Sequence, residues 1–584
     1  MLIDLNRKQT VFAQIKGLSP VRVLPEDSVG LFALQGAQQD LGSVQIVPVQ
    51  GQSFHRALRV SISAGSRTEW NVQIRTANTT PIAAGDVILA RFWVRCEESM
   101  TGEAFTTFLM ELSKPEWEKS VELRASGNKE WRQYSVPFKS LSTFAAGEAQ
   151  FCFRLGFDRQ TIDIGGVEIL NYGKAVSVDD LPRTRVTYSG READAEWRQE
   201  ALARIEKLRK GDLQLKLTDK AGKPIAGAKV HVKMLRHAFG FGSAVAAEEL
   251  LGNAPDNRHY RDAFERLFNR AVFENDMKWP QCHPEPHARL EAAMTWLAER
   301  QITVRGHCLI WPSWRWLPRD LKALSDSPAE LRQRCVDRVS SMVSQFRGRV
   351  NHWDVINEPY ANHDLMDLLG NEVMIDWFKL AREADPQCKL VLNDYGIVDG
   401  GGSDRAHQDH FYDAIKYLKD NGAPIDGVGI QSHFGMVLTA PAQLLRVLDR
   451  FSEFGLPIES TEVSLNISDR ALQADFMRDY MIAVFSHPNV HGIMLWGFWE
   501  GRHWRPEAAL YDHNWNLRPH GQVWVDLVHK QWKTDLELKT DGSGRAQVRG
   551  FCGDYELTID SGGIAKVVRI DLPHEGRQVD VIVD

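Results

Sequence analysis

Short apolar runs that recur along the middle of the chain constrain its fold more than any other feature. Eight of them follow one another between residues 237 and 500, at intervals of roughly 30 to 50 residues. They read HAFGFGSAV, AVFENDMKW, TVRGHCLIW, HWDVINEP, KLVLNDYG, GVGIQSHF, PIESTEVS and GIMLWGFWE. Amphipathic segments such as PAELRQRCVDRVSSMVSQF separate them, which is the alternation expected of βα units. Eight units predict a closed (β/α)8 TIM barrel. A doubly wound open sheet is the alternative, but the sequence has no convincing phosphate-binding loop.

The chain on either side of this region has the alternating pattern of β-strands. With 584 residues it is too long for one hydrophobic core. Residues 1–178 contain alternating runs such as HRALRVSIS, VILARFWVR and AQFCFRLGF, and we expect an N-terminal antiparallel β-sandwich. Residues 211–235 and 533–584 have the same character. We expect them to pair into one small β-domain split around the barrel at 236–532, because two strands alone are marginal. Two separate decorations of the barrel are the alternative.

Residues 179–210 predict a helical connector between the sandwich and the rest of the chain. Ser189 and Glu192 have the spacing of a capping box, and Gly211 stands where a helix would end. An apolar stripe is formed by Trp197, Ala201, Ile205 and Leu208.

Composition excludes several classes of function. A formal charge of −7 gives no reason to expect nucleic acid or an anionic membrane as a partner, and no apolar stretch is long enough to span a bilayer. The start, MLIDLNRKQTVF, lacks the features of a secretory signal, so the sequence does not predict a location.

Seven scattered cysteines without a CxxC pair argue against a disulfide framework or zinc ribbon. HPEPH at 283–287 is interpreted as a loop, and no metal or other cofactor is expected. Oligomeric state is not predicted.

Polar side chains gather toward the C-terminal ends of seven of the eight predicted strands. They are Glu274, Asn275 and Lys278 on the second, His307 and Trp311 on the third, Asn357 and Glu358 on the fourth, Asn393, Asp394 and Tyr395 on the fifth, Gln431 and His433 on the sixth, Glu462 on the seventh, and Trp496 and Glu500 on the eighth. Barrel enzymes build their active sites at that face. We therefore expect one site to which these strands contribute.

Glu358 and Glu462 are the candidate catalytic pair. They end strands four and seven, which lie nearly opposite each other in a closed eight-stranded barrel. Two carboxyl groups about 5 Å apart are the equipment for retaining glycoside hydrolysis, in which one is an ionised nucleophile and the other a proton donor. Their mutual repulsion helps to keep one of them protonated near neutral pH.

These segments resemble those of a known family. HWDVINEPY and IESTEVSL are similar to the acid/base and nucleophile segments of glycoside hydrolase family 10, the retaining β-1,4-xylanases. FENDMKW, VRGHCLIW, LNDYG, GIQSH and LWGFWEGRHW resemble that family's other strand-end motifs, in the same order, over about residues 237–530. The resemblance implies Glu358 as acid/base, Glu462 as nucleophile, xylan or a xylan-type oligosaccharide as substrate, and no cofactor.

The resemblance also implies roles for the neighbouring residues. Asn357 would bind the 2-hydroxyl of the sugar under attack, and His433 would hold Glu462, with Gln431 nearby. The other implied contacts are Glu274, Asn275 and Lys278 to the neighbouring sugar, His307 and Trp311 in the same cleft, Trp496 and Trp504 as aromatic walls, and Tyr395 near the cleaved bond. Plainer interpretations stay open: a Glu274–Lys278 surface pair, core histidines, core tryptophans, and a rim charge for Glu500.

Three departures from the family's pattern bear on the substrate. Pro312, Ser313 and Trp314 stand where His-Ser-Gln is usual, Ser464 stands where a carboxylate is usual, and Gly396 replaces an asparagine. Another β-glycan or short xylo-oligosaccharides are therefore alternative substrates, and a carbohydrate-binding protein without turnover is an alternative function. The N-terminal segment, ending FDRQTIDIGGVEILNYG, loosely resembles carbohydrate-binding modules; a purely structural sandwich is the alternative. Its candidate binding residues, which are equally good core residues, are Trp93, Trp117 and Trp131.

Overall fold

The computed structural model describes residues 18–583, except for 67, 101, 113–116, 283–287 and 436. The predicted loop at 283–287 and the start of the chain lie outside the described residues. Two compact units divide the chain: residues up to 186 together with 403–409, and 187–402 together with 410–584. No helix within the described part is long and apolar enough to cross a bilayer.

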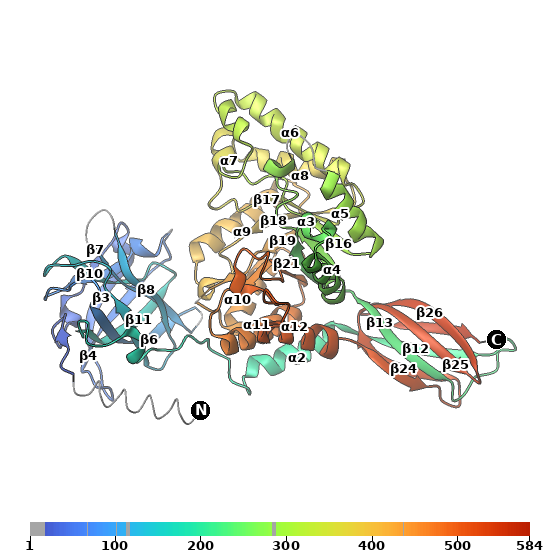
Figure 1. Cartoon of the computed structure of the whole chain (residues 1–584), viewed down its shortest axis with the longest axis horizontal. Helices are drawn as coiled ribbons and strands as arrows, with labels where there is room; N and C mark the ends of the chain where they lie inside the picture. The colour runs from blue at the N-terminus through green and yellow to red at the C-terminus, as the bar shows by residue number, and fades with distance from the viewer. Residues whose placement is uncertain are drawn as a thin grey trace. The chain divides into compact units, whose positions relative to one another are not determined.

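The first unit contains the predicted antiparallel sandwich (Figure 1). One sheet has the order β3-β4-β11-β6-β9, with β1 beside β11, and the other has the order β2-β5-β10-β7-β8. The strands are β1 (Val21–Arg22), β2 (Ala33–Gln35), β3 (Gly42–Pro48), β4 (Arg56–Ile62), β5 (Gln73–Ala77), β6 (Val87–Ser99), β7 (Ala104–Leu112), β8 (Lys119–Gly127), β9 (Arg132–Lys139), β10 (Ala149–Arg154) and β11 (Gln160–Asn171).

Alternation along β6 shows which face of its sheet meets the core. Phe92 and Val94 are buried in the sandwich core, whereas Trp93 between them is only partly buried. Trp93 and the partly buried Trp131 both contact Phe54, with ring centroids 5.4 and 5.1 Å away. Trp117 is 44% exposed. The three tryptophans singled out in the sequence are therefore not core residues of the sandwich.

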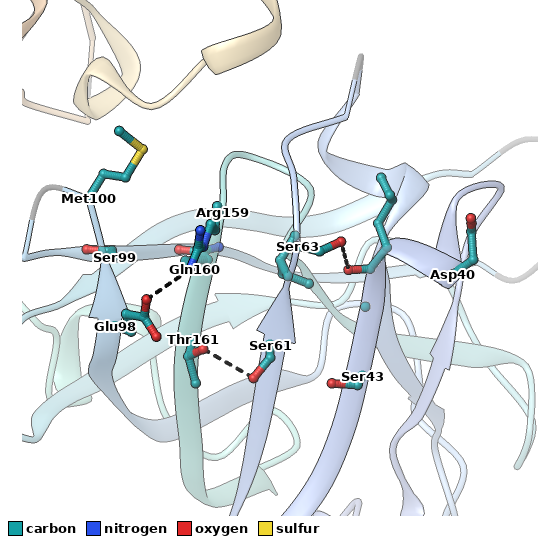
Figure 2. A pocket seen from close by; sticks show the side chains of 13 residues that line it. Asp40, Ser43, Ser61, Ser63, Glu98, Ser99, Met100, Arg159, Gln160 and Thr161 are labelled. Carbon is teal, nitrogen blue, oxygen red and sulfur yellow. Dashed lines mark hydrogen bonds and ion pairs between the residues drawn. The ribbon is translucent and has the colours of Figure 1, made fainter.

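A cavity of about 730 Å³ opens over the same sheet (Figure 2). Part of the cavity is lined by a row of hydroxyl groups from three neighbouring strands, β3, β4 and β11. They belong to the register partners Ser43, Ser61 and Thr161. An ion pair of 3.3 Å between Glu98 and Arg159 borders the cavity. The cavity is thus lined mainly by polar groups.

The second unit is built around a closed barrel of eight parallel strands, as predicted. The strands are β14 (Gly240–Val245), β15 (Arg270–Phe273), β16 (Thr303–Gly306), β17 (His352–Asn357), β18 (Lys389–Asp394), β19 (Gly427–Ile430), β21 (Ile458–Leu465) and β22 (Val490–Leu495), with a short β20 (His433–Phe434) beside β21. Pairing of β22 with β14 and of β19 with β21 completes the ring. Each predicted run supplies one strand, because a strand covered on both faces needs continuous apolar sequence.

Helices follow the barrel strands in chain order. They are α3 (Ala247–Leu251), α4 (Pro255–Leu267), α5 (Ala288–Glu299), α6 (Pro328–Gln345), α7 (Asp364–Leu369), α8 (Glu372–Ala384), α9 (Arg405–Asp420), α10 (Pro441–Ser452), α11 (Arg470–Ser486) and α12 (Pro519–Asp526). The amphipathic segments of the sequence account for them: the buried residues of α6, for example, recur at helical spacing from Leu331 to Val343.

A smaller β-region joins the two ends of the second unit. Its strands are β12 (Lys210–Thr218), β13 (Lys229–His237), β23 (Asp535–Lys539), β24 (Arg545–Phe551), β25 (Gly553–Ser561), β26 (Ile564–Leu572) and β27 (Arg577–Ile582). Strand β12 lies between β24 and β27, and β13 lies between β23 and β25. In Figure 1 the green strands lie among the red ones. Segments from before and after the barrel therefore pair, rather than decorating it separately.

The predicted capping box of the connector is wrong. Helix α2 (Glu196–Leu208) begins after Ala195, which makes no side-chain cap. Arg198 explains the later start: its guanidinium is ion-paired with the buried Asp479 and donates hydrogen bonds to the carbonyls of Glu192 and Ala193. A tertiary ion pair thereby fixes these residues outside the helix and overrides the local signal.

Candidate active site

Glu358 and Glu462 come from β17 and β21, which only β18 and β19 separate on the shorter way around the barrel. Glu358 follows the last residue of β17, and Glu462 lies in β21 with only 4% of its surface exposed. The backbone of Glu358 has a φ of 56°, and its N–H donates to the carbonyl of Asn393 at 2.8 Å. A positive φ at a residue with a side chain costs on the order of 1 kcal/mol and recurs at functional sites.

One chain of hydrogen bonds connects the two carboxyl groups. The Asn393 amide donates to Oε1 of Glu462 at 2.9 Å and to Oδ1 of Asn357 at 2.8 Å. The Gln431 amide donates to Oε1 of Glu358 at 2.9 Å and lies 3.4 Å from the same Asn357 oxygen. The hydroxyl of Thr461 donates to the side-chain oxygen Oδ1 of Asn393 at 2.7 Å, which orients the Asn393 side-chain amide. Four strand ends therefore hold both acids in one network.

The environment of Glu358 favours its protonated form. Burial is the main cause, and the negative charges of Glu462 and Asp394 add to it, so the pKa of Glu358 rises to about 7 although Gln431 donates to it. A carboxylic acid with such a pKa can donate a proton near neutral pH.

The environment of Glu462 favours its ionised form. Burial alone would raise its pKa, but the imidazoles of His307 and His433 outweigh burial and lower the pKa below the ordinary value. Nε2 of His433 lies 3.3 Å from Oε2 of Glu462, and Nδ1 of His307 lies 3.9 Å from Oε1. The site thus pushes the pKa values of its two acids in opposite directions, the pattern that separates a proton donor from a nucleophile.

A buried ion network lies behind this pair. Arg305, on β16, is 0% exposed and binds both Asp354 on β17 and Glu459 on β21. Glu459 also pairs with Arg270 on β15, and Asp354 accepts from Nδ1 of His307 at 2.9 Å. The network orients His307, and it joins four strands inside the barrel.

The comparisons with known proteins fit this geometry. Residues 231–526 match the model of glycosyl hydrolase family 10. The chain belongs to this family.

Relatives share different parts of the chain. Endo-1,4-beta-xylanase B of Thermotoga neapolitana is 30% identical over 319 residues, which cover 50% of this chain and 89% of that protein. Anti-sigma-I factor RsgI6 of Acetivibrio thermocellus is 34% identical over 377 residues, 64% of this chain and 48% of that protein. Endo-1,4-beta-xylanase 1 of Arabidopsis thaliana is 28% identical over 440 residues, 71% and 45% respectively. The chain thus spans just under half the length of these last two relatives.

Solved structures of the family also resemble the chain. Xylanase 10B from Thermotoga petrophila RKU-1, in complex with xylobiose, is 29% identical with a TM-score of 0.47; the match covers 50% of this chain and 95% of that one. Native xylanase 10B from Thermotoga maritima is 28% identical with a TM-score of 0.46, covering 50% and 96%.

The remaining family 10 motif residues lie at the same strand ends. Lys278 donates to Asn275 at 3.0 Å, and its ammonium lies 5.1 Å from the ring centroid of Trp311. Burial raises the pKa of Glu274. Trp311 stacks on Trp316, with centroids 4.2 Å apart. Trp316 is a site residue that the sequence does not predict, because nothing in a linear pattern shows that it stacks on Trp311.

The two predicted aromatic walls differ in exposure. Trp496 is 6% exposed and packs in a small core cluster, edge-on to His307 at 5.0 Å. Trp504 is 47% exposed and lies edge-on to His433 at 5.0 Å. Glu500 forms an ion pair of 2.7 Å with Arg518, which accounts for it as a structural charge. Trp504 is therefore the better candidate for an open sugar-stacking surface.

Tyr395 follows β18 and is partly buried, and its backbone N–H donates a hydrogen bond to the carboxylate of Asp394 at 2.9 Å. Within the described part of the chain, no group of three His, Cys, Asp or Glu residues could hold a metal ion. Asn393, which the sequence placed at a strand end without a role, connects the two carboxyl groups.

Proposed function

We propose that this family 10 member is a retaining glycoside hydrolase that cleaves β-1,4-xylosidic bonds, with Glu358 as acid/base and Glu462 as nucleophile. The observation that carries the proposal is that one hydrogen-bond network connects two carboxyl groups whose pKa values are shifted in opposite directions. The pKa of Glu358 is raised to about 7, while that of Glu462 is lowered. The xylan-type substrate rests on relatives named endo-1,4-beta-xylanases.

The proposed reaction has two displacements. First, a Glu462 oxygen attacks the anomeric carbon while Glu358 gives its proton to the glycosidic oxygen, so that the C–O bond breaks and a glycosyl ester forms. Glu358, now ionised, then takes a proton from water, the water oxygen attacks the anomeric carbon, and Glu462 leaves as a carboxylate. Both transition states carry oxocarbenium character, which the ionised Glu462 stabilises. No cofactor takes part.

Asn357 has a free donor for the substrate. Its Oδ1 accepts from Asn393 and Gln431, while its Nδ2 is buried and has no hydrogen-bond partner in the structure. A buried donor without a partner costs about 1–3 kcal/mol, and a hydrogen bond to the substrate would recover that cost. This observation supports the proposed bond from Asn357 to the 2-hydroxyl of the sugar under attack.

The test uses wild-type protein, Glu462→Ala and the matched control Glu299→Ala, a glutamate that is 67% exposed. Release of aryl alcohol from aryl β-xylosides and of reducing sugar from xylan is measured. We expect Glu462→Ala to lose on the order of 10⁴-fold or more in kcat, and Glu299→Ala to match wild type. Equal turnover by wild type and Glu462→Ala would refute the nucleophile assignment.

A binding protein without turnover is the second candidate, because one relative is named an anti-sigma factor and not an enzyme. It predicts that wild type hydrolyses none of the tested β-glycans while still binding xylan. Activity on another β-glycan alone, abolished by Glu462→Ala, would keep the mechanism and change the substrate.

We also infer that the N-terminal sandwich binds the glycan. Trp93 and Trp131, grouped around Phe54 outside the core and only partly buried, are the supporting observation, because partly exposed aromatic rings stack on apolar faces of ligands. The guanidinium of Arg95 already lies 4.8 Å from the ring centroid of Trp131. In a Glu462→Ala background, replacing both tryptophans with alanine should reduce the retardation of the protein in a xylan-containing gel. Trp70→Ala, which removes another exposed ring of the sandwich, is the control. Unchanged retardation of the double variant would contradict the inference.

A further inference from the structure

Ser464 stands two residues after Glu462 on β21, so both side chains face the same way. Ser464 is 1% exposed, and its neighbours are the side chains of His433 and Trp504. Its Oγ lies 3.3 Å from Nε1 of Trp504 and 3.3 Å from Nδ1 of His433. A carboxylate is usual at this position in the family, and the serine here contacts an indole and an imidazole instead.

The direction of each hydrogen bond in this group is inferred from what its atoms can donate and accept. An indole N–H can only donate, so the Ser464 oxygen accepts from Trp504. The serine oxygen could also accept from His433, but the buried serine proton needs an acceptor of its own. Among the described residues, the structure gives this proton no acceptor other than Nδ1 of His433. A neutral imidazole that accepts at Nδ1 carries its proton on Nε2, the nitrogen that faces Oε2 of Glu462 at 3.3 Å.

A carboxylate in place of Ser464 would have the opposite effect. An ionised carboxylate can only accept, so it would require the proton on Nδ1 of His433. Nε2 could then donate to Glu462 only while the ring carries a positive charge. With serine at this position the His433 ring need not be charged, because the neutral ring already presents its Nε2 proton to the nucleophile.

We propose that Ser464 is a positioning residue that holds neutral His433 in the Nε2–H tautomer, so that the hydrogen bond to Glu462 does not depend on the charge of the ring. The proposal deepens the proposed function and rests on it. Trp504, Ser464, His433 and Glu462 form a chain in which each group donates to the next. The same hydroxyl thus orients an exposed aromatic wall and the residue that holds the nucleophile.

Other titratable groups near these four residues do not reverse the hydrogen bonds that run from Trp504 to Glu462. His307 faces Glu462 from the end of β16, and its Nδ1 proton is directed to Asp354 on β17. His503, beyond β22, lies near enough to His433 to interact electrostatically, but burial lowers the pKa of His503 to about 3, so that this imidazole is neutral at the pH of the test. Glu358 is held by Gln431 and Asn362 and makes no contact with Ser464.

The first test locates the proton. Neutron diffraction from crystals of the perdeuterated protein at about pH 9, above the ordinary range of histidine, shows which ring nitrogen carries deuterium. We expect deuterium on Nε2 alone in wild type, and on Nδ1 in Ser464→Asp. Ser460→Ala is the control: it removes another buried serine of β21, one that bonds Ser432 and Tyr480. It should match wild type. Deuterium on Nδ1 of wild-type His433 would overturn the proposal.

The second test measures turnover. Ser464→Ala should lower kcat about fivefold, the equivalent of one neutral hydrogen bond, and Ser464→Thr, which keeps the hydroxyl, should restore it. A threonine variant as slow as the alanine variant, or an alanine variant as fast as wild type, would contradict the positioning role. Diffraction requires no turnover, so it tests Ser464 even if the proposed function fails on every glycan.

Discussion

At the scale of single residues, the raised pKa of Glu358 determines how turnover depends on pH. The general acid must hold its proton, so activity requires a pH below the pKa of this group, which is about 7. We expect kcat/KM for xylan to fall about tenfold per pH unit above that value. Initial rates between pH 5 and 9 measure it.

The variant Glu358→Gln should confirm the origin of the alkaline limb. Glutamine does not titrate, so the limb should vanish on an aryl xyloside whose leaving group needs no proton. An alkaline limb that is the same in Glu358→Gln would assign it to another group.

The free donor of Asn357 gives a second prediction at this scale. If Nδ2 binds the sugar 2-hydroxyl and the bond strengthens in the transition state, Asn357→Ala should lower kcat/KM on aryl β-xylosides about 100-fold. On 2-deoxy analogues the loss should be far smaller. Comparison of the two substrates cancels any structural effect of the variant, and an equal loss on both would exclude a bond to the 2-hydroxyl.

Sequence reasoning reached the candidate pair and most motif residues, but not the groups that connect them. Each motif is a local pattern, and Glu358 and Glu462 stand out because an acid is unusual beside buried strand residues. Asn393 bonds Glu462 across 69 positions of sequence, and Trp316 stacks on Trp311 through a loop that departs from the family's pattern. Such pairings depend on tertiary structure that a linear pattern does not contain.

At the scale of elements, the buried arginine of β16 holds neighbouring strands together. Burial alone would raise the pKa of Glu459, but Arg270 and Arg305 outweigh burial and lower it. A carboxylate with a lowered pKa stabilises the fold above its unfolded pKa of about 4.3, and that contribution is lost as pH falls through the folded value. The barrel should therefore lose stability progressively as the pH falls below about 4.3.

Arg305→Met tests this network. Removing one partner leaves Asp354 and Glu459 buried with less compensation, which typically costs about 3–5 kcal/mol. The free energy of unfolding in urea at pH 7 measures the loss. Arg300→Met is the matched control, because its ion pair with Glu265 is partly exposed and should contribute less than about 1 kcal/mol. Equal losses for both variants would contradict a structural role for the network.

Elements differ in how well the sequence predicts them. The eight barrel strands were predicted because continuous apolar runs determine them locally. The start of α2 was not, since the ion pair between Arg198 and Asp479 decides it, and those residues are 281 positions apart. Local signals fail where a buried charge must find its partner.

At the scale of the whole chain, the small β-region ties the two ends of the second unit together. Strand β12 pairs only with β24 and β27, and β13 only with β23 and β25, among the described residues. Leu213, Leu217 and Val232 of these strands are 0% exposed. Alternating sequence on both sides of the barrel predicted this pairing, because neither piece could bury its apolar face alone.

Truncation after residue 532 should therefore destabilise the protein although it leaves every barrel strand in place. It removes all partners of β12 and β13 and exposes two apolar strands with free edges, which favours aggregation. The soluble yield and the melting temperature measure the effect. Co-expression of residues 533–584 as a separate fragment should restore solubility, because the missing strands can pair without a covalent link. A truncated protein that is soluble and melts like wild type would show that the barrel does not need this region. Failure of the fragment to restore solubility would show instead that pairing depends on the intact chain.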